Sequence, residues 1–320
     1  MYDYVITVPG QGSHRPGMLD SWLTEAPHAQ DLHAQDLLAE WSDAAGLDLL
    51  AAGRDGVAMS DTAVAQPLIT AAALLSLERL RARLEPAPGR VLYAGHSVGE
   101  LAAAAGAGYL SPTAAIVLAR ARGKAMSAAC AAAPTGMVAC MPSKRDGAPD
   151  ESIVDAIHAG GLAVANWNGS HQFVAAGPLT AAEDFATTPP RGMRVVRLEV
   201  AGAFHTEAMA PAQESFAQAV AQVSWRTPDS AMLGNGDGAL VAGPDDLRQR
   251  LVTQLTSAVR WDLCAQAIAA HSSTETLHIE LAPAGPLTKL AERARPWMRA
   301  VALRAADDLD GVPALSRSGA

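Results

Sequence analysis

The sequence predicts an α/β fold with a parallel sheet, because apolar strand-like segments alternate with helix-forming segments along its first part. Strands are expected at residues 4–8, where the chain leads into a glycine-rich loop, and at 91–94. An Ala/Leu-rich helix is expected at 68–84, and Pro112 opens a second helix that carries Arg122. This alternation is what a doubly wound sheet requires.

The pattern changes from about residue 134. Strand, helix, strand, strand, helix and strand are expected in turn at 137–141, 150–160, 162–165, 173–176, 179–185 and 193–200. The order βαββαβ is that of a ferredoxin-like unit. We therefore predict a small ferredoxin-like subdomain at 134–199. It would be inserted in a large catalytic domain made of residues 1–133 and 200–320, with the active site in the cleft between them.

A serine between two glycines lies where the second strand meets its helix, in Gly95-His96-Ser97-Val98-Gly99-Glu100. In a Gly-x-Ser-x-Gly elbow the backbone turns sharply, so neighbouring side chains are not tolerated and the serine hydroxyl is lifted towards solvent. Backbone N–H groups at the helix start can then hold a developing oxyanion. The motif predicts a hydrolase-like domain with Ser97 as nucleophile. In an ordinary strand–turn–helix link the serine would only cap the helix.

A histidine that could act as a base follows the last predicted strand. Gly202-Ala203-Phe204-His205-Thr206 comes directly after the apolar-alternating segment 195–200. A serine nucleophile needs a base, and the unperturbed pKa of histidine suits this task near neutral pH. We therefore predict that His205 serves Ser97, although the chain has nine histidines and one could follow a strand by chance.

The composition is that of a packed globular protein. Of the 320 residues, 49% are hydrophobic and 18% are charged, which argues against disorder. A net charge of −9 argues against nucleic-acid binding, which needs clustered Lys and Arg. Cys130, Cys140 and Cys264 have neither paired nor metal-ligand spacing, so we expect a reducing cytoplasm and no metal site. No signal peptide is evident and the apolar stretch after Glu100 is too short to span a bilayer, so no membrane partner is expected.

Seven short motifs occur in the order in which one enzyme family has them: Pro9-Gly10-Gln11-Gly12-Ser13, Gln66-Pro67, Gly95 to Glu100, Arg122-Gly123-Lys124-Ala125-Met126, Ala165-Asn166-Trp167-Asn168, Gly202-Ala203-Phe204-His205, and Gln254 ahead of Trp261. Through them nearly the whole chain resembles the malonyl-CoA:acyl-carrier-protein transacylase family. Each motif alone is weak, and their common order makes the resemblance specific. The resemblance also implies the inserted ferredoxin-like subdomain.

The resemblance implies roles for the residues of the predicted catalytic centre. Ser97 would be the nucleophile, and His205 its base and then the acid for the leaving thiolate. The main-chain carbonyl of Gln254 would orient the imidazole, in place of the carboxylate of a Ser-His-Asp triad. The chain departs from the family here, because Thr256-Ser257-Ala258 stands where Asn-Pro is often found.

The resemblance also implies how the substrate is held. The backbone N–H groups of Gln11 and Val98 would form the oxyanion hole. Arg122 would grip a substrate carboxylate with two parallel hydrogen bonds. As an arginine that serves a ligand, it is expected to contribute little to the core. Phe204 would narrow the acyl pocket and favour an unbranched malonyl group.

Other residues have simpler interpretations. His96 and Glu100 are interpreted as structural parts of the elbow. Asn166 and Asn168 fall in a motif that borders the cleft, but a turn would explain them equally well. The basic residues near the cleft that could contact an acidic carrier are Arg191, Arg194 and Lys289.

The predicted reaction is a ping-pong transfer of the malonyl group from malonyl-CoA to the phosphopantetheine thiol of acyl carrier protein, supplying fatty-acid elongation through a malonyl-Ser97 intermediate. No cofactor is expected, because ester and thioester are close in energy and the task is positioning and charge stabilisation. The protein is expected to act as a monomer. Two alternatives stay open: a serine esterase or thioesterase, which would prefer water as acceptor and not need Arg122, and an acyltransferase subunit of a malonate decarboxylase or polyketide assembly.

Overall fold

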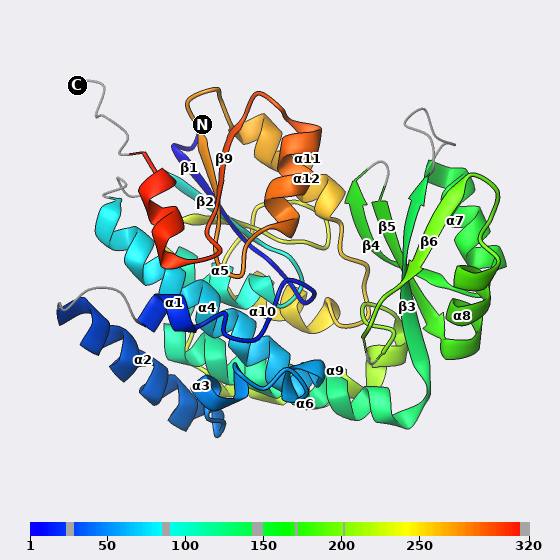
Figure 1. Cartoon of the computed structure of the whole chain (residues 1–320), viewed down its shortest axis with the longest axis horizontal. Helices are drawn as coiled ribbons and strands as arrows, with labels where there is room; N and C mark the ends of the chain where they lie inside the picture. Colours follow the sequence, from blue (N-terminus) through cyan, green and yellow to red (C-terminus); the bar gives the residue numbers. More distant parts are fainter. Residues whose placement is uncertain (24–28, 85–89, 143–149, 170–171, 201, 314–320) are drawn as a thin grey trace.

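A five-stranded parallel sheet lies at the centre of the larger part of the computed structural model, which describes residues 1–23, 29–84, 90–142, 150–169, 172–200 and 202–313 (Figure 1). Neighbouring strands pair in parallel in the order β7-β2-β1-β8-β9. Their bounds are β1 Tyr4–Val8, β2 Val91–Gly95, β7 Ala231–Leu233, β8 Leu277–Glu280 and β9 Arg299–Ala302. The carboxyl end of β2 carries the predicted elbow.

Helices cover both faces of this sheet, as a parallel sheet requires. Along β1, the side chains of Ile6 and Val8 join the main core, whereas Val5 packs on the opposite face against Trp261 and Leu287. On the first face lie the helices α2 Ala29–Ala45, α4 Thr62–Arg83, α5 Gly99–Ala107, α6 Pro112–Ala132 and α9 Ala210–Gln222. The opposite face is covered by α11 Trp261–His271 and α12 Pro286–Ala294. The short or peripheral helices are α1 Asp20–Leu23, α3 Leu49–Ala52, α10 Pro244–Thr253, and the 3₁₀ turns Ala58–Ser60, Glu207–Met209 and Ala306–Gly311.

Helix α4 begins at Thr62 and not at residue 68 as predicted, so Pro67 lies inside it. Asp61 caps the helix, because its carboxylate accepts a hydrogen bond from the Ala63 amide at 2.8 Å. Proline has no N–H to donate to the carbonyl four residues earlier, and that carbonyl, on Ala63, accepts instead from Nη1 of Arg120 on α6. Within the described residues, α4 alone is long and apolar enough to cross a membrane, and 83% of its most apolar window is buried in the protein, which is typical of a core helix.

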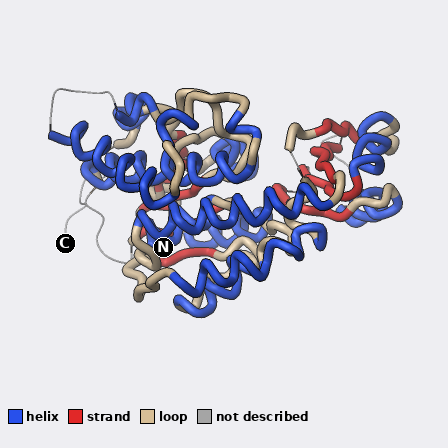
Figure 2. The backbone as a smooth tube through the Cα atoms, turned by 90° about the horizontal axis from the view of Figure 1, so that it is seen from below, coloured by secondary structure: helices blue, strands red, loops and turns tan. Residues whose placement is uncertain are grey.

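An antiparallel sheet forms the smaller part of the molecule, with strand order β4-β5-β3-β6. It consists of β3 Thr135–Pro142, β4 Ala163–Gly169, β5 Gln172–Pro178 and β6 Met193–Arg197, with helices α7 Asp150–Ala159 and α8 Leu179–Thr187. Both the succession of elements and the strand order are those of a ferredoxin-like unit, so the predicted fold class is confirmed. Figure 2 shows this part projecting from one end of the larger one. The exact division at residues 134 and 199 stays a prediction.

The smaller sheet has one covered face and one face turned to the larger part. Val138 and Cys140 of β3 belong to the small core under α7 and α8, whereas Met137 and Met141 line a cavity on the other side. Strand β4 is tied to the larger part, because the Val259 amide donates to the Ala165 carbonyl at 2.9 Å and the Val259 carbonyl accepts from the Trp167 amide at 2.8 Å. These two hydrogen bonds connect β4 to the segment between α10 and α11 of the larger part.

Candidate active site

Ser97 lies at the apex of a sharp turn between β2 and α5. Its φ of 54° is a left-handed conformation, which is rare for a residue with a side chain and is found at strained functional positions. A Cβ added at Gly95 would lie 2.2 Å from the Glu100 amide nitrogen, and one added at Gly99 would lie 2.3 Å from the Val8 carbonyl oxygen. Both flanking positions must therefore be glycine for this turn to form.

His205 lies within hydrogen-bonding distance of Ser97. Its Nε2 is 2.8 Å from the Ser97 Oγ, and its Nδ1 is 2.9 Å from the main-chain carbonyl oxygen of Gln254. A carbonyl only accepts hydrogen bonds, so Nδ1 carries the proton and Nε2 accepts from the serine hydroxyl. Gln254 follows the last turn of α10, where carbonyls have no partner within the helix and are free to accept from a side chain. The structure thus brings together the three predicted residues Ser97, His205 and Gln254.

The surroundings keep the His205 imidazole neutral. Its side chain is buried, and burial together with the nearby positive charge of Arg122 lowers the pKa of His205 to about 3. The imidazole therefore has a free Nε2 lone pair throughout the neutral pH range, as a general base needs. Its φ of 61° is a second left-handed conformation, which the sequence did not reveal.

The predicted oxyanion amides belong to Gln11 and Val98. Val98 follows Ser97 directly and caps α5, and Gln11 lines the same cavity as Ser97, beside Gly10. Neither amide donates to a protein acceptor among the hydrogen bonds of the described residues. Two unpaired N–H groups beside a serine hydroxyl can stabilise an oxyanion on an attacked carbonyl.

Arg122 lies next to Ser97 but is only 1% exposed, and it is not among the residues that line the cavity. Its Nη2 donates to the Ser97 Oγ at 3.3 Å and to the Gln254 Oε1 at 2.6 Å, and its Nη1 donates to the Gln66 Oε1 at 2.9 Å. Burial lowers the pKa of Arg122 to about 10, so the guanidinium is charged at neutral pH. The expectation that Arg122 contributes little to the core is wrong, because its hydrogen bonds hold two buried amides.

Gly123 explains how α6 brings Arg122 so close to α4. A Cβ at Gly123 would lie 2.5 Å from the Thr62 carbonyl oxygen, so only glycine permits this helix contact. Beyond Gln66 the hydrogen bonds continue, because the Gln66 Nε2 donates to the Thr62 Oγ1 at 3.1 Å and that hydroxyl donates to the Gln11 Oε1 at 2.6 Å. One chain of side chains therefore links the predicted substrate arginine to the predicted oxyanion loop.

A cavity of about 380 Å³ opens in front of Ser97, between the two sheets. Phe204 is buried and lines this cavity, and its narrowing of the acyl pocket stays a prediction. Apolar side chains of the smaller sheet and polar or basic ones of the larger part share the lining, chiefly Met137, Met141, Val174, Leu198, His96, Lys289 and Arg293. Such a mixed lining can hold a ligand that has an apolar or amide-bearing arm and a charged end.

Some residues are placed differently from their sequence interpretation. Asn166 and Asn168 lie in strand β4 and line the cavity, so the turn interpretation is wrong for both. The Asn168 Oδ1 is 3.0 Å from the His96 Nε2, so His96 also contacts the cavity wall and is more than a part of the turn. Of the three basic candidates, Lys289 lines the cavity, Arg194 is exposed on β6 opposite Met141, and Arg191 lies outside the lining.

Glu100 is the residue whose surroundings the sequence least revealed. Its carboxylate is 1% exposed, and it accepts hydrogen bonds from the Asn235 amide at 2.7 Å and from the Gln254 Nε2. Burial raises the pKa of Glu100 to about 7, against the lowering effects of the Asn235 amide and of the cations Arg122 and Arg250. The nearby Cys264 thiol, whose Sγ lies 3.6 Å from the Gly234 carbonyl oxygen, has a pKa that burial raises.

Comparisons with known proteins agree with this geometry. A family model described as an acyl transferase domain matches residues 4–294. The malonyl CoA-acyl carrier protein transacylase of Mycobacterium tuberculosis strain H37Rv is 43% identical over 307 residues, which cover 95% of this chain and 97% of that protein. The protein of that name from Mycolicibacterium smegmatis is 41% identical over 302 residues, covering 93% of this chain and 100% of the relative.

Solved structures give the same result. The crystal structure of MCAT from Mycobacterium tuberculosis has a TM-score of 0.88 and 42% identity, covering 96% of this chain and 98% of that one. The malonyl-CoA:acyl carrier protein transacylase FabD from Xanthomonas oryzae pv. oryzae has a TM-score of 0.85 and 30% identity, covering 97% of each chain. The resemblance predicted from the seven motifs is confirmed. The chain belongs to the acyl transferase family and, within it, to the malonyl-CoA:acyl carrier protein transacylases.

Proposed function

We propose that this protein transfers a malonyl group from malonyl-CoA to the phosphopantetheine thiol of acyl carrier protein. The observation that carries the proposal is the buried Arg122, whose Nη2 lies 3.3 Å from the Oγ of a serine already hydrogen-bonded to His205. A permanent positive charge next to the nucleophile favours an acyl group that itself ends in a carboxylate. A general esterase has no use for such a charge.

In the first half-reaction, the Ser97 Oγ attacks the thioester carbonyl carbon while its proton moves to the His205 Nε2. The oxyanion that forms is held by the amides of Gln11 and Val98. The carbon–sulfur bond then breaks, His205 returns the proton to the CoA thiolate, and a malonyl ester remains on Ser97. The Gln254 carbonyl keeps the proton of His205 on Nδ1, so the base always presents Nε2 to the reaction.

In the second half-reaction, the carrier thiol enters the same cavity. Its proton moves to the His205 Nε2 as its sulfur attacks the ester, and Ser97 leaves with the proton that His205 returns. Arg122 holds the malonyl carboxylate in both halves. The transfer needs no cofactor or metal, because thioester and serine ester are close in energy and the protein supplies positioning and charge stabilisation.

The biological setting follows from the same chemistry. We infer that malonyl-CoA and acyl carrier protein are the partners, that the product supplies fatty-acid elongation, and that the protein acts as a monomer in the cytoplasm. All three cysteines are free thiols, which suits a reducing compartment.

The proposal is tested by intact mass. The wild-type protein, exposed briefly and separately to malonyl-CoA and acetyl-CoA, should gain one malonyl group much faster than one acetyl group. Added acyl carrier protein should remove the malonyl group faster than water does, and Ser97→Ala should gain no mass. Faster loss to water than to the carrier thiol would show an esterase, and acylation of the alanine variant would assign the nucleophile elsewhere.

A further inference from the structure

Glu100 is a buried acid that the proposed transfer does not use. It lies in the first turn of α5, three residues after the nucleophile, yet its side chain turns away from the cavity into the larger part. A carboxylate with no exposed surface is costly unless its charge is compensated and its oxygens are hydrogen-bonded. Its place in the fold therefore requires an explanation beyond the geometry of the turn.

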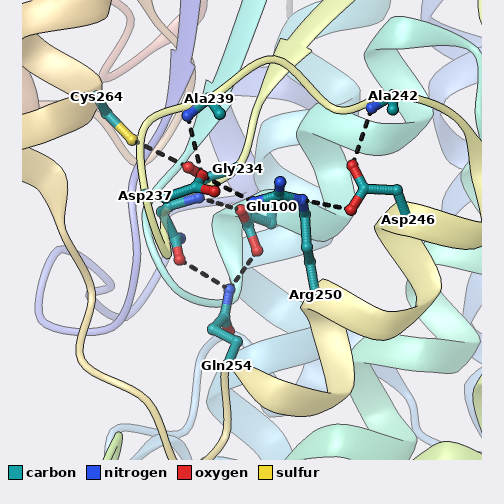
Figure 3. Close-up of polar contacts among 10 residues, drawn as sticks. Glu100, Gly234, Asp237, Ala239, Ala242, Asp246, Arg250, Gln254 and Cys264 are labelled. Carbon is teal, nitrogen blue, oxygen red and sulfur yellow. Dashed lines mark hydrogen bonds and ion pairs between the residues drawn. The ribbon is translucent and has the colours of Figure 1, made fainter.

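The side-chain amide of Gln254 connects Glu100 to Arg122. The Nε2 of Gln254 donates towards three acceptors, the Glu100 Oε2, the Asn235 Oδ1 at 3.2 Å and the Ser97 carbonyl at 3.3 Å. Figure 3 shows the contact between Gln254 and Glu100. The orientation of Asn235 is itself fixed, because its Nδ2 donates to the Gly95 carbonyl at 2.8 Å. With its nitrogen committed to acceptors, the Gln254 amide must turn its oxygen to the Arg122 Nη2, at 2.6 Å.

The positive charge that Glu100 balances is that of Arg122. The other nearby cation, Arg250, already forms ion pairs at 2.8 Å with both Asp237 and Asp246, as Figure 3 shows. Among the described residues no carboxylate contacts Arg122 directly, and Glu100 is the acidic group that raises its pKa. The Gln254 amide thus stands between a buried anion and a buried cation.

We propose that Glu100 is a positioning residue for malonyl selection, which holds Arg122 in place through the Gln254 amide while leaving the remaining guanidinium donors to the substrate. This role rests on the proposed function. A carboxylate in direct contact with Arg122 would occupy the donors that the malonyl carboxylate needs. An amide between them passes on the orientation and leaves those donors available, because its neutral oxygen occupies one hydrogen atom of one Nη.

Glu100→Gln tests the proposal with a nearly unchanged shape. Its amide oxygen can accept from the Asn235 amide, which places its NH₂ group against the Gln254 Nε2. Gln254 must then lose that hydrogen bond or turn its own NH₂ group towards Arg122. Either result weakens the hold on Arg122, so kcat/KM for malonyl-CoA should fall about tenfold to a hundredfold. Acetyl-CoA has no carboxylate and its kcat/KM should fall about threefold or less. The malonyl-to-acetyl ratio is the readout, because a loss of folded protein lowers both values equally.

Two further variants complete the experiment. Glu280→Gln removes another fully buried carboxylate, one that accepts from the amides at the start of α12 and does not touch this network, and it should leave the ratio unchanged. Gln254→Met keeps the carbonyl that serves His205 but removes the connecting amide. It should reproduce the effect of Glu100→Gln, and the double variant should be no worse than either single one.

The outcomes separate this role from the proposed function. Malonyl transfer by the wild type with an unchanged ratio in Glu100→Gln, or additive losses in the double variant, would overturn the positioning role alone. Should Glu100→Gln fail to fold, a malonyl preference retained by Gln254→Met would overturn it as well. A wild-type protein with no malonyl preference would overturn the proposed function and this role together.

Discussion

Replacing Arg122 by methionine separates malonyl transfer from general acyl transfer. Methionine keeps most of the length and volume of the side chain but removes the charge and every donor. Alanine would add a cavity, because Arg122 is among the largest fully buried side chains of the protein. The methionine variant therefore isolates the electrostatic contribution better.

The magnitude follows from the lost contacts. A malonyl carboxylate that has lost its buried cationic partner is destabilised by about 3–5 kcal/mol. At about 1.4 kcal/mol per tenfold, kcat/KM for malonyl-CoA should fall about a hundredfold to a thousandfold. Acetyl-CoA should lose little. The variant also leaves the Gln66 and Gln254 amide oxygens without their donor, so its melting temperature should fall.

The assay is the rate at which Ser97 gains malonyl or acetyl mass, measured with thermal melts of each variant. Arg120→Met is the matched control, because Arg120 lies on the same helix and bonds the Ala63 carbonyl without contacting Ser97. It should lower stability and leave the malonyl-to-acetyl ratio unchanged. If Arg122→Met is folded and still prefers malonyl-CoA, another cation binds the substrate and the reasoning is refuted.

Three more predictions follow from the cavity and its charges. Phe204→Ser should admit methylmalonyl-CoA. Because a pocket discriminates one methyl group by only about 1–3 kcal/mol, we expect a partial shift in kcat/KM for methylmalonyl-CoA relative to malonyl-CoA. No shift would show that Phe204 does not set this specificity. Lys289→Glu should raise KM for the acidic carrier at low salt and leave KM for malonyl-CoA unchanged. The same charge reversal at Arg191, which lies outside the cavity lining, should raise KM for the carrier less. Equal losses with both substrates would indicate misfolding. The pKa of Glu100 lies at about 7 and that of His205 at about 3. The preference for malonyl-CoA over acetyl-CoA should therefore weaken as the pH falls below 7, while acetyl transfer persists to lower pH. A preference independent of pH would contradict the need for an ionised Glu100.

The amino-acid sequence by itself determined the local geometry of the nucleophile. The Gly95-x-Ser97-x-Gly99 spacing predicts the turn, because at Gly95 a Cβ would clash with the Glu100 amide, only five residues away, whereas the clash at Gly99 is with the Val8 carbonyl of the neighbouring strand. The alternation of apolar segments likewise determined the two kinds of sheet, since hydrophobic periodicity is a local property. The strands β7, β8 and β9 were not predicted, because they are only three or four residues long and their pairing depends on distant partners.

Only the tertiary structure decided what the polar side chains do. The helix predicted to begin at residue 68 begins at Thr62, and Pro67 lies inside it because Arg120, on another helix, donates to the carbonyl that the proline leaves free. Arg122 could be recognised as a substrate residue by resemblance, but its burial comes from the packing of α6 against α4, and its bond to Gln254 comes from the position of the residue that follows α10. Glu100 could not be given a partner at all from its neighbours. The orientation of an amide between two buried charges depends on atoms that only folding brings into contact, and no sequence spacing encodes that contact.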